Sequence, residues 1–231
     1  MSISIKFSSI GINVNPSPHK FNLLDALSVL TDDEPCDTTG HHLWTGSLAL
    51  AKFIDKNQNL FMSKSILELG AGLGLCSILA STLSDTVICT DGDEESLELA
   101  ASNYRANHSL TKSSISFSHL LWEDLGTADK LVEIYTPIDI VIGGDIIYTE
   151  SAMQNVIHIS KRLLKNNGLL VIGYCPRDGF PSKLLNSFTQ YAKDNRFILI
   201  KGPLFISLNE FSHLDLVHDD PEPLVVVFQL N

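Results

Sequence analysis

Residues 66–80 read Ile-Leu-Glu-Leu-Gly-Ala-Gly-Leu-Gly-Leu-Cys-Ser-Ile-Leu-Ala, and this stretch decides the fold. An apolar strand runs into three glycines and then into an apolar helix. Glycine at positions 70, 72 and 74 lets the backbone turn tightly and approach a ligand closely, because glycine has no Cβ. The helix that follows directs its free N–H groups toward the same place. The stretch predicts a ligand-binding turn between a strand and a helix, with a glycine-rich turn that binds nothing as the alternative.

The spacing of the glycines distinguishes this turn from two common nucleotide sites. A dinucleotide-binding motif needs a glycine at position 75, but Leu75 stands there and the third glycine comes one residue earlier. The Lys-Ser or Lys-Thr pair of a phosphate-binding loop is also missing from the motif. What remains is Glu68 ahead of alternating glycines, and a second apolar run that ends at Asp91. A carboxylate in that position suits the two hydroxyls of a ribose.

A second candidate site follows another apolar run. Residues 139–148 read Asp-Ile-Val-Ile-Gly-Gly-Asp-Ile-Ile-Tyr, which predicts a buried strand and then a site-forming loop. The glycine motif, with Glu68 before it and Asp91 after the next apolar run, resembles the S-adenosylmethionine (SAM) site of the seven-β-strand methyltransferases. Asp145 and Tyr148 resemble the Asp-x-x-Tyr motif of the non-SET protein lysine methyltransferases. That family includes enzymes that act on translation elongation factors, molecular chaperones and calmodulin.

Two Leu-Trp pairs strengthen the resemblance. The pair at 43–44 opens a helix ahead of the glycine motif, and the pair at 121–122 follows the third strand. The resemblance implies a SAM-dependent protein-lysine N-methyltransferase in which Asp145 and Tyr148 receive the lysine. It also implies a set of residues that bind the cofactor, namely Trp44, Glu68, Gly70, Gly72, Gly74, Asp91, Trp122 and Gly143. Structural alternatives stay open, because both tryptophans could fill gaps, Asp145 could be a turn or cap residue, and Tyr148 could be a core residue.

The order of apolar runs predicts an α/β fold. We expect strands near 64–70, 86–91, 114–120, 138–144, 168–175, 196–201 and 223–230, and helices near 45–56, 74–83, 93–107, 150–166 and 182–194. Asn167-Gly168 is expected to end the fourth helix. Alternating strands and helices indicate a Rossmann-like, mostly parallel sheet with helices on both faces and with ligands at the carboxyl ends of the strands. The last run has no helix before it, so we expect it to be the one antiparallel strand.

Length and composition bound the remaining possibilities. The 231 residues suit one methyltransferase domain over 44–231, with residues 1–43 as an N-terminal appendage packed on the core. A net charge of -11 disfavours direct binding of nucleic acid and favours a basic protein segment as the partner. We expect a monomer. We expect no membrane contact, because the uninterrupted apolar runs are only a few residues long. The four cysteines lack CxxC spacing and suit reduced thiols, so we expect the protein in the cytoplasm and possibly the nucleus.

The partner and the reaction keep alternatives at this stage. The resemblance implies a protein substrate that presents a lysine, such as a translation factor or a chaperone-like protein. A methyltransferase for a small molecule is one alternative, and a SAM-binding interaction protein without catalysis is another. No metal site is expected, because His41 and His42 lack a cysteine or carboxylate at ligand spacing and are interpreted as loop histidines.

Overall fold

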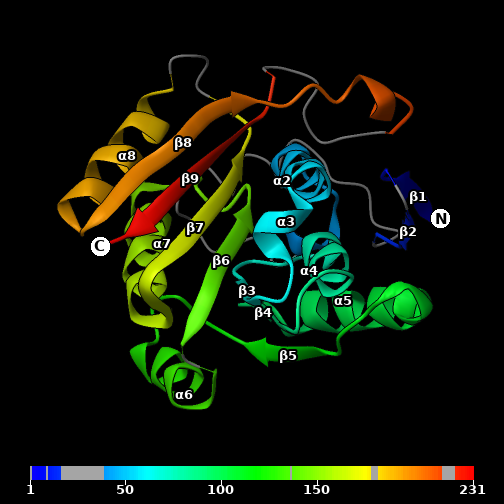
Figure 1. Cartoon of the computed structure of the whole chain (residues 1–231), viewed down its shortest axis with the longest axis horizontal. Helices are drawn as coiled ribbons and strands as arrows, with labels where there is room; N and C mark the ends of the chain where they lie inside the picture. Colours follow the sequence, from blue (N-terminus) through cyan, green and yellow to red (C-terminus); the bar gives the residue numbers. More distant parts are fainter. Residues whose placement is uncertain (1, 9, 17–38, 136, 178–181, 215–221) are drawn as a thin grey trace.

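The computed structural model describes residues 2–8, 10–16, 39–135, 137–177, 182–214 and 222–231. The main sheet consists of β3 (Ser65–Glu68), β4 (Thr86–Asp91), β5 (Ile115–His119), β6 (Ile138–Gly144), β7 (Leu164–Tyr174), β8 (Phe197–Phe205) and β9 (Leu224–Leu230). Its strand order is β5-β4-β3-β6-β7-β9-β8 (Figure 1). All neighbours are parallel except β9, which runs antiparallel to both β7 and β8. The predicted seven-stranded fold with its antiparallel last strand is confirmed.

Helices cover both faces of this sheet (Figure 1). One face carries α2 (Thr45–Lys56), α4 (Leu75–Ser81) and α5 (Glu94–Asn107), with the short α3 (Gln58–Phe61) after α2. The other face carries α6 (Leu125–Tyr135), α7 (Glu150–Leu163) and α8 (Lys183–Asp194). Neighbouring strand residues alternate between the two cores, as Val225 and Val226 do in β9. Because both faces of the inner strands are buried, these strands are continuous apolar runs, which is why they could be predicted.

Two predictions about helices were incomplete or wrong. Helix α6 was not predicted. It connects β5, which pairs parallel with β4, to β6, which pairs parallel with β3. Parallel strands in one sheet need a crossover connection, which is usually a helix. Helix α7 ends at Leu163, and β7 begins in the next residue. Asn167-Gly168 therefore does not end a helix. Asn167 uses its tolerance for left-handed backbone, with φ of 62°, inside the first part of β7.

The N-terminal residues form a hairpin apart from the main sheet. Strand β1 (Ile3–Lys6) pairs antiparallel with β2 (Gly11–Val14). The main chain of Asn13 exchanges two hydrogen bonds of 2.9 and 2.7 Å with the amide side chain of Asn107 in α5. The division of the chain at residue 43 stays a prediction. Among the described residues, no helix combines the length and the apolarity that crossing a bilayer requires.

Candidate active site

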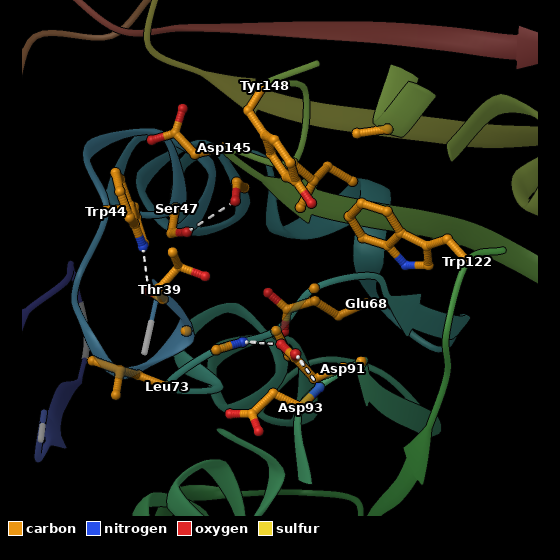
Figure 2. Close-up of a pocket in the computed structure, with 18 of the residues that line it drawn as sticks. Thr39, Trp44, Ser47, Glu68, Leu73, Asp91, Asp93, Trp122, Asp145 and Tyr148 are labelled. Atoms are coloured by element: carbon orange, nitrogen blue, oxygen red, sulfur yellow. Dashed lines mark hydrogen bonds between the residues drawn. The ribbon is translucent and has the colours of Figure 1, made fainter. Parts of the chain in front are cut away.

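A cavity of about 420 Å³ opens at the carboxyl ends of the central strands. Its walls come from the segments that follow β3, β4, β5, β6 and β7, and from residues just before and within α2. Strand β3 is the point where the order of the sheet reverses, with β4 on one side and β6 on the other. Open α/β sheets bind ligands in the crevice at such a switch point. Figure 2 shows the side chains that converge there.

The glycine loop after β3 has left-handed backbone, as glycine allows. Gly70 has φ of 59° and Gly72 has φ of 49°. A Cβ at Gly72 would lie 2.8 Å from the carbonyl oxygen of Gly40, and one at Gly70 would lie 2.8 Å from Ile146 Cγ2. Both glycines line the cavity, but the protein's own packing already requires them. The space that a Cβ would fill at these glycines is therefore occupied by Gly40 and Ile146 of the protein itself, and not only by a ligand.

Two other predicted glycines do not line the cavity. A Cβ at Gly74 would lie 2.9 Å from Ala100 Cβ, so this glycine lets α4 pack against α5. A Cβ at Gly143 would collide with Ile146 Cδ1. The lining residue after β6 is Gly144, which is the next residue along the chain.

Glu68 is a buried carboxylate at the end of β3. Its side chain is 2% exposed, and Oε2 accepts hydrogen bonds from Ser77 N at 2.8 Å and from Ser77 Oγ at 2.5 Å. Burial raises the pKa of the Glu68 carboxyl to about 7, although the bonds from Ser77 act in the opposite direction. The carboxylate thus joins β3 to the first turns of α4 and also borders the cavity.

Asp91 ends β4 and lies between two loops. Its Oδ2 accepts from Gly72 N at 2.8 Å and its Oδ1 accepts from Asp93 N at 3.0 Å (Figure 2). Each oxygen keeps a lone pair for a further donor, as binding of two ribose hydroxyls requires. Burial raises the pKa of the Asp91 carboxyl, which these backbone bonds partly offset. Asp93 instead caps α5, because its side chain accepts from Glu95 N and Ser96 N.

Residues just before α2 form one wall of the cavity. Trp44 Nε1 donates to the carbonyl of Thr39 at 2.7 Å (Figure 2). The turn η1 (Thr39–His41) is also held through His41, whose Nε2 lies 3.2 Å from Asp93 Oδ2. His41 is therefore buried and bonded, which the interpretation as a loop histidine did not anticipate. Thr39, Gly40 and His42 line the cavity with Trp44.

Trp122 and Tyr148 form an aromatic wall. Their ring centroids lie 6.4 Å apart, with 34° between the planes. Trp122 Nε1 is buried and has no hydrogen-bond acceptor in the described part of the chain. Tyr148 is 37% exposed, so it is accessible from outside the cavity. A flat apolar surface with one unused donor suits an adenine ring.

Asp145 has a strained backbone and a bound carboxylate. Its φ is 56°, which is uncommon for a residue with a side chain, and it is 8% exposed. Oδ2 accepts from Gly46 N in the first turn of α2 at 2.6 Å, and Oδ1 accepts from Cys175 N after β7 at 2.8 Å. The cap role that we left open is thus present, because the carboxylate lies at the positive end of α2. Asp145 also lines the cavity beside Tyr148, so its predicted role toward a lysine stays a prediction.

Gly46, Ser47 and Arg177 are among the residues near the cavity that were missed from sequence. Gly46 is needed for the approach of Asp145, since a Cβ there would lie 2.5 Å from the carboxylate. Ser47 lines the cavity, and its Oγ donates to the carbonyl of Gly144 at 3.3 Å. Arg177 lines it from the segment after β7, with its guanidinium carbon 4.8 Å from the centroid of the Trp44 ring. The rule that ligands gather beyond the carboxyl ends of strands could have drawn attention to Arg177.

Comparison with known proteins decides the family. A family model described as "Lysine methyltransferase" matches residues 24–193, which is more than half of the chain. The chain belongs to the lysine methyltransferase family. The family match confirms the predicted family and, with it, SAM as the cofactor. The detailed assignment of site residues is not tested by this match.

Individual relatives of this family member agree with the assignment. Human methyltransferase-like protein 22 is 30% identical over 174 residues, which cover 68% of this chain and 42% of the relative. The protein-lysine N-methyltransferase EFM3 of Chaetomium thermophilum is 31% identical over 151 residues, which cover 64% of this chain and 44% of the relative. The chain thus spans less than half of the length of these relatives.

A solved structure supports the fold of this family member. An S-adenosylmethionine-dependent methyltransferase from Clostridium acetobutylicum superposes with a TM-score of 0.57 at 12% identity, covering 80% of this chain and 92% of that one.

The cavity of this family member fits SAM chemically. Asp91 offers acceptors for ribose hydroxyls, the Trp122 wall offers an apolar face, and several carboxylates border a space in which a sulfonium and an ammonium would lie.

Proposed function

We propose that this chain transfers a methyl group from SAM to the ε-amino group of a lysine on another protein. One observation carries the proposal: Asp145 and Tyr148 line the same cavity as Gly70, Gly72 and Asp91. A carboxylate and a phenol therefore border the space that would hold the methyl donor. Such a pair suits a cationic acceptor, because the carboxylate attracts the ammonium and the ring adds a cation–π contact.

The chemistry asks the protein mainly for alignment. SAM supplies a methyl group on a sulfonium, whose leaving group is a neutral thioether. The C–S bond breaks as the C–N bond forms. The lysine is an ammonium with a pKa of about 10.4, so it must first lose a proton, and water can accept that proton. Asp145 and Tyr148 would hold the amine in line with the methyl carbon, at about 3–3.5 Å. Asp145 can do this without moving, since its two backbone bonds fix the carboxylate.

A protein substrate is favoured over a small molecule for two reasons. Relatives of this chain are named as protein-lysine methyltransferases. The net charge of -11 complements a basic segment of a partner, and a translation factor or a chaperone-like protein is the class that we propose. We place the reaction in the cytoplasm or nucleus, in keeping with the buried reduced thiols of Cys76 and Cys89.

Transfer of radiolabel tests the proposal. The protein is incubated with labelled SAM and a cell lysate, and the products are separated on a gel and by extraction of small molecules. A labelled protein band whose label maps to lysine supports the proposal. Label found only in a soluble metabolite contradicts it in favour of a small-molecule enzyme, and no label at all favours a binding protein.

Tyr148→Phe and Tyr148→Ala then test the acceptor site. Both variants should bind S-adenosylhomocysteine (SAH) within a few-fold of wild type, yet methylate the labelled protein at least tenfold more slowly, because small misplacements of the acceptor slow transfer strongly. Tyr104→Phe is the matched control, since Tyr104 packs on Phe117 and does not line the cavity. Wild-type methylation rates in both Tyr148 variants would show that the acceptor lies elsewhere.

A further inference from the structure

The charges around the cavity are strongly unequal. Among the described residues that line it, Arg177 alone carries an arginine or lysine side chain. The carboxylates that line the same cavity are those of Glu68, Asp91, Asp93, Glu123 and Asp145. SAM has the complementary pattern, with a sulfonium and an ammonium as cations and one α-carboxylate as its anion.

Arg177 packs on Trp44 and has no anionic partner among the described residues. Its guanidinium carbon lies 4.8 Å from the centroid of the Trp44 ring, and Trp44 is itself fixed by the bond to Thr39. Arg177 Nε is buried and has no hydrogen-bond acceptor, and no ion pair of Arg177 is found, within the part of the chain that the structure describes. A buried donor without a partner is unfavourable, and more so when it is charged, because it has lost its hydrogen bonds to water. A bound anion would remove this cost.

The segment of Arg177 fixes which side of the cavity it occupies. Cys175, two residues earlier, donates its backbone N–H to Asp145, and Trp44 directly precedes α2, whose Gly46 donates to the same carboxylate. Arg177 therefore belongs to the side of the cavity formed by α2 and the end of β7. Asp91, which suits the ribose, ends β4 instead, and β4 is separated from β7 by β3 and β6.

We propose that Arg177, held on Trp44, binds the α-carboxylate of the methionine half of SAM. The methionine half extends from the ribose on the side away from the adenine. It would run from Asp91, across the glycine loop, toward the side of the cavity that holds Arg177. A guanidinium stacked on an aromatic face keeps its N–H donors available, and two of them match a carboxylate. The inference rests on SAM as the cofactor and does not depend on lysine as the acceptor.

An acidic side chain of a protein substrate would present the same chemistry, and a truncated ligand separates the two sources. SAH carries the α-carboxylate, whereas 5′-methylthioadenosine keeps the adenosine and the thioether but lacks the amino acid part. Both ligands are titrated calorimetrically into the chain of 231 residues, as wild type and as Arg177→Met. Methionine retains an apolar contact with Trp44 and removes the charge.

Arg177→Met should weaken SAH about tenfold to a hundredfold and change the affinity for 5′-methylthioadenosine by less than about twofold. Arg177→Lys should give an intermediate loss for SAH, because lysine keeps the charge but not the paired donors. Arg162→Met is the control, since Arg162 lies on the surface of α7 in an ion pair with Asp129. It should leave both affinities unchanged.

Two results would overturn the proposal. Unchanged SAH affinity in Arg177→Met would mean that the carboxylate partner is not the cofactor and would favour a substrate residue. Equal losses for both ligands would mean that Arg177 only supports the fold of the cavity wall. The pattern of ligand affinities is measured without a methyl acceptor, so it is informative even if no lysine is methylated.

Discussion

Glu68→Gln should make the stability of the protein less dependent on pH. Burial raises the pKa of the Glu68 carboxyl from 4.5 to about 7 in the native state. Between these values the unfolded chain has lost a proton that the native protein keeps, so the free energy of unfolding of wild type falls as pH rises. The shift of about 2.5 pH units, at about 1.4 kcal/mol per unit, gives a loss of about 3 kcal/mol that is complete near pH 8, about one unit above the native pKa.

Glutamine removes this titration while retaining the local contacts. Its amide oxygen can accept from both Ser77 donors, as Glu68 Oε2 does. Between pH 4.5 and pH 8, the free energy of unfolding of wild type should therefore fall by about 3 kcal/mol relative to that of Glu68→Gln. Below about pH 3.5 the difference should stay constant, because the carboxyl is then protonated in both states.

Urea denaturation followed by circular dichroism, at intervals of half a pH unit, measures this difference. Glu133→Gln is the matched control, because Glu133 is exposed on α6, and its difference curve should be flat. A flat curve for Glu68→Gln, or one in which wild type gains relative to the variant as pH rises, would refute the argument from burial.

Two further predictions concern the site. Asp91→Ala should weaken the binding of SAH about tenfold to a hundredfold in calorimetry, because it removes the proposed ribose acceptor and the bond from Gly72. A loss of affinity below about threefold would mean that other residues bind the ribose. Gly46→Ala should lower the methylation rate at least tenfold, because the added Cβ would lie 2.5 Å from the carboxylate of Asp145, whereas Gly11→Ala in the N-terminal hairpin should methylate at the wild-type rate.

The fold could be predicted because its signals are local. The inner strands of the sheet are buried on two faces and are therefore apolar runs, as the segment from Leu224 to Leu230 is. The turn from 68 to 75 was found because its glycines are close together in sequence. Asn167 shows the limit of such signals. An Asn-Gly pair permits left-handed backbone equally well at a helix end and within a strand, and only the pairing of β6 with β7 decides between them.

The missed parts of the site depend on contacts between distant residues. Gly46 and Asp145 are 99 residues apart, and His41 and Asp93 are 52 apart, so neither bond leaves a pattern in any short window of sequence. Thr39, Gly40 and His42 line the cavity, but from sequence they were placed in the N-terminal appendage, because no local pattern connects them to the site. Arg177 is a single cation in a loop, and its place over Trp44 follows only from the packing of α2 beside β7.

The sequence has two tryptophans, and both line the cavity. All intrinsic indole emission of the protein therefore originates at the proposed cofactor site, without background from elsewhere in the chain. The two indoles also differ in their surroundings, because Trp44 lies under a guanidinium and donates to a carbonyl, whereas Trp122 lies beside a tyrosine. Trp44→Phe and Trp122→Phe would each leave one emitter, near the methionine half or near the adenine half of the ligand. Stopped-flow recordings of the two variants would then show which end of the ligand arrives first, with no attached dye.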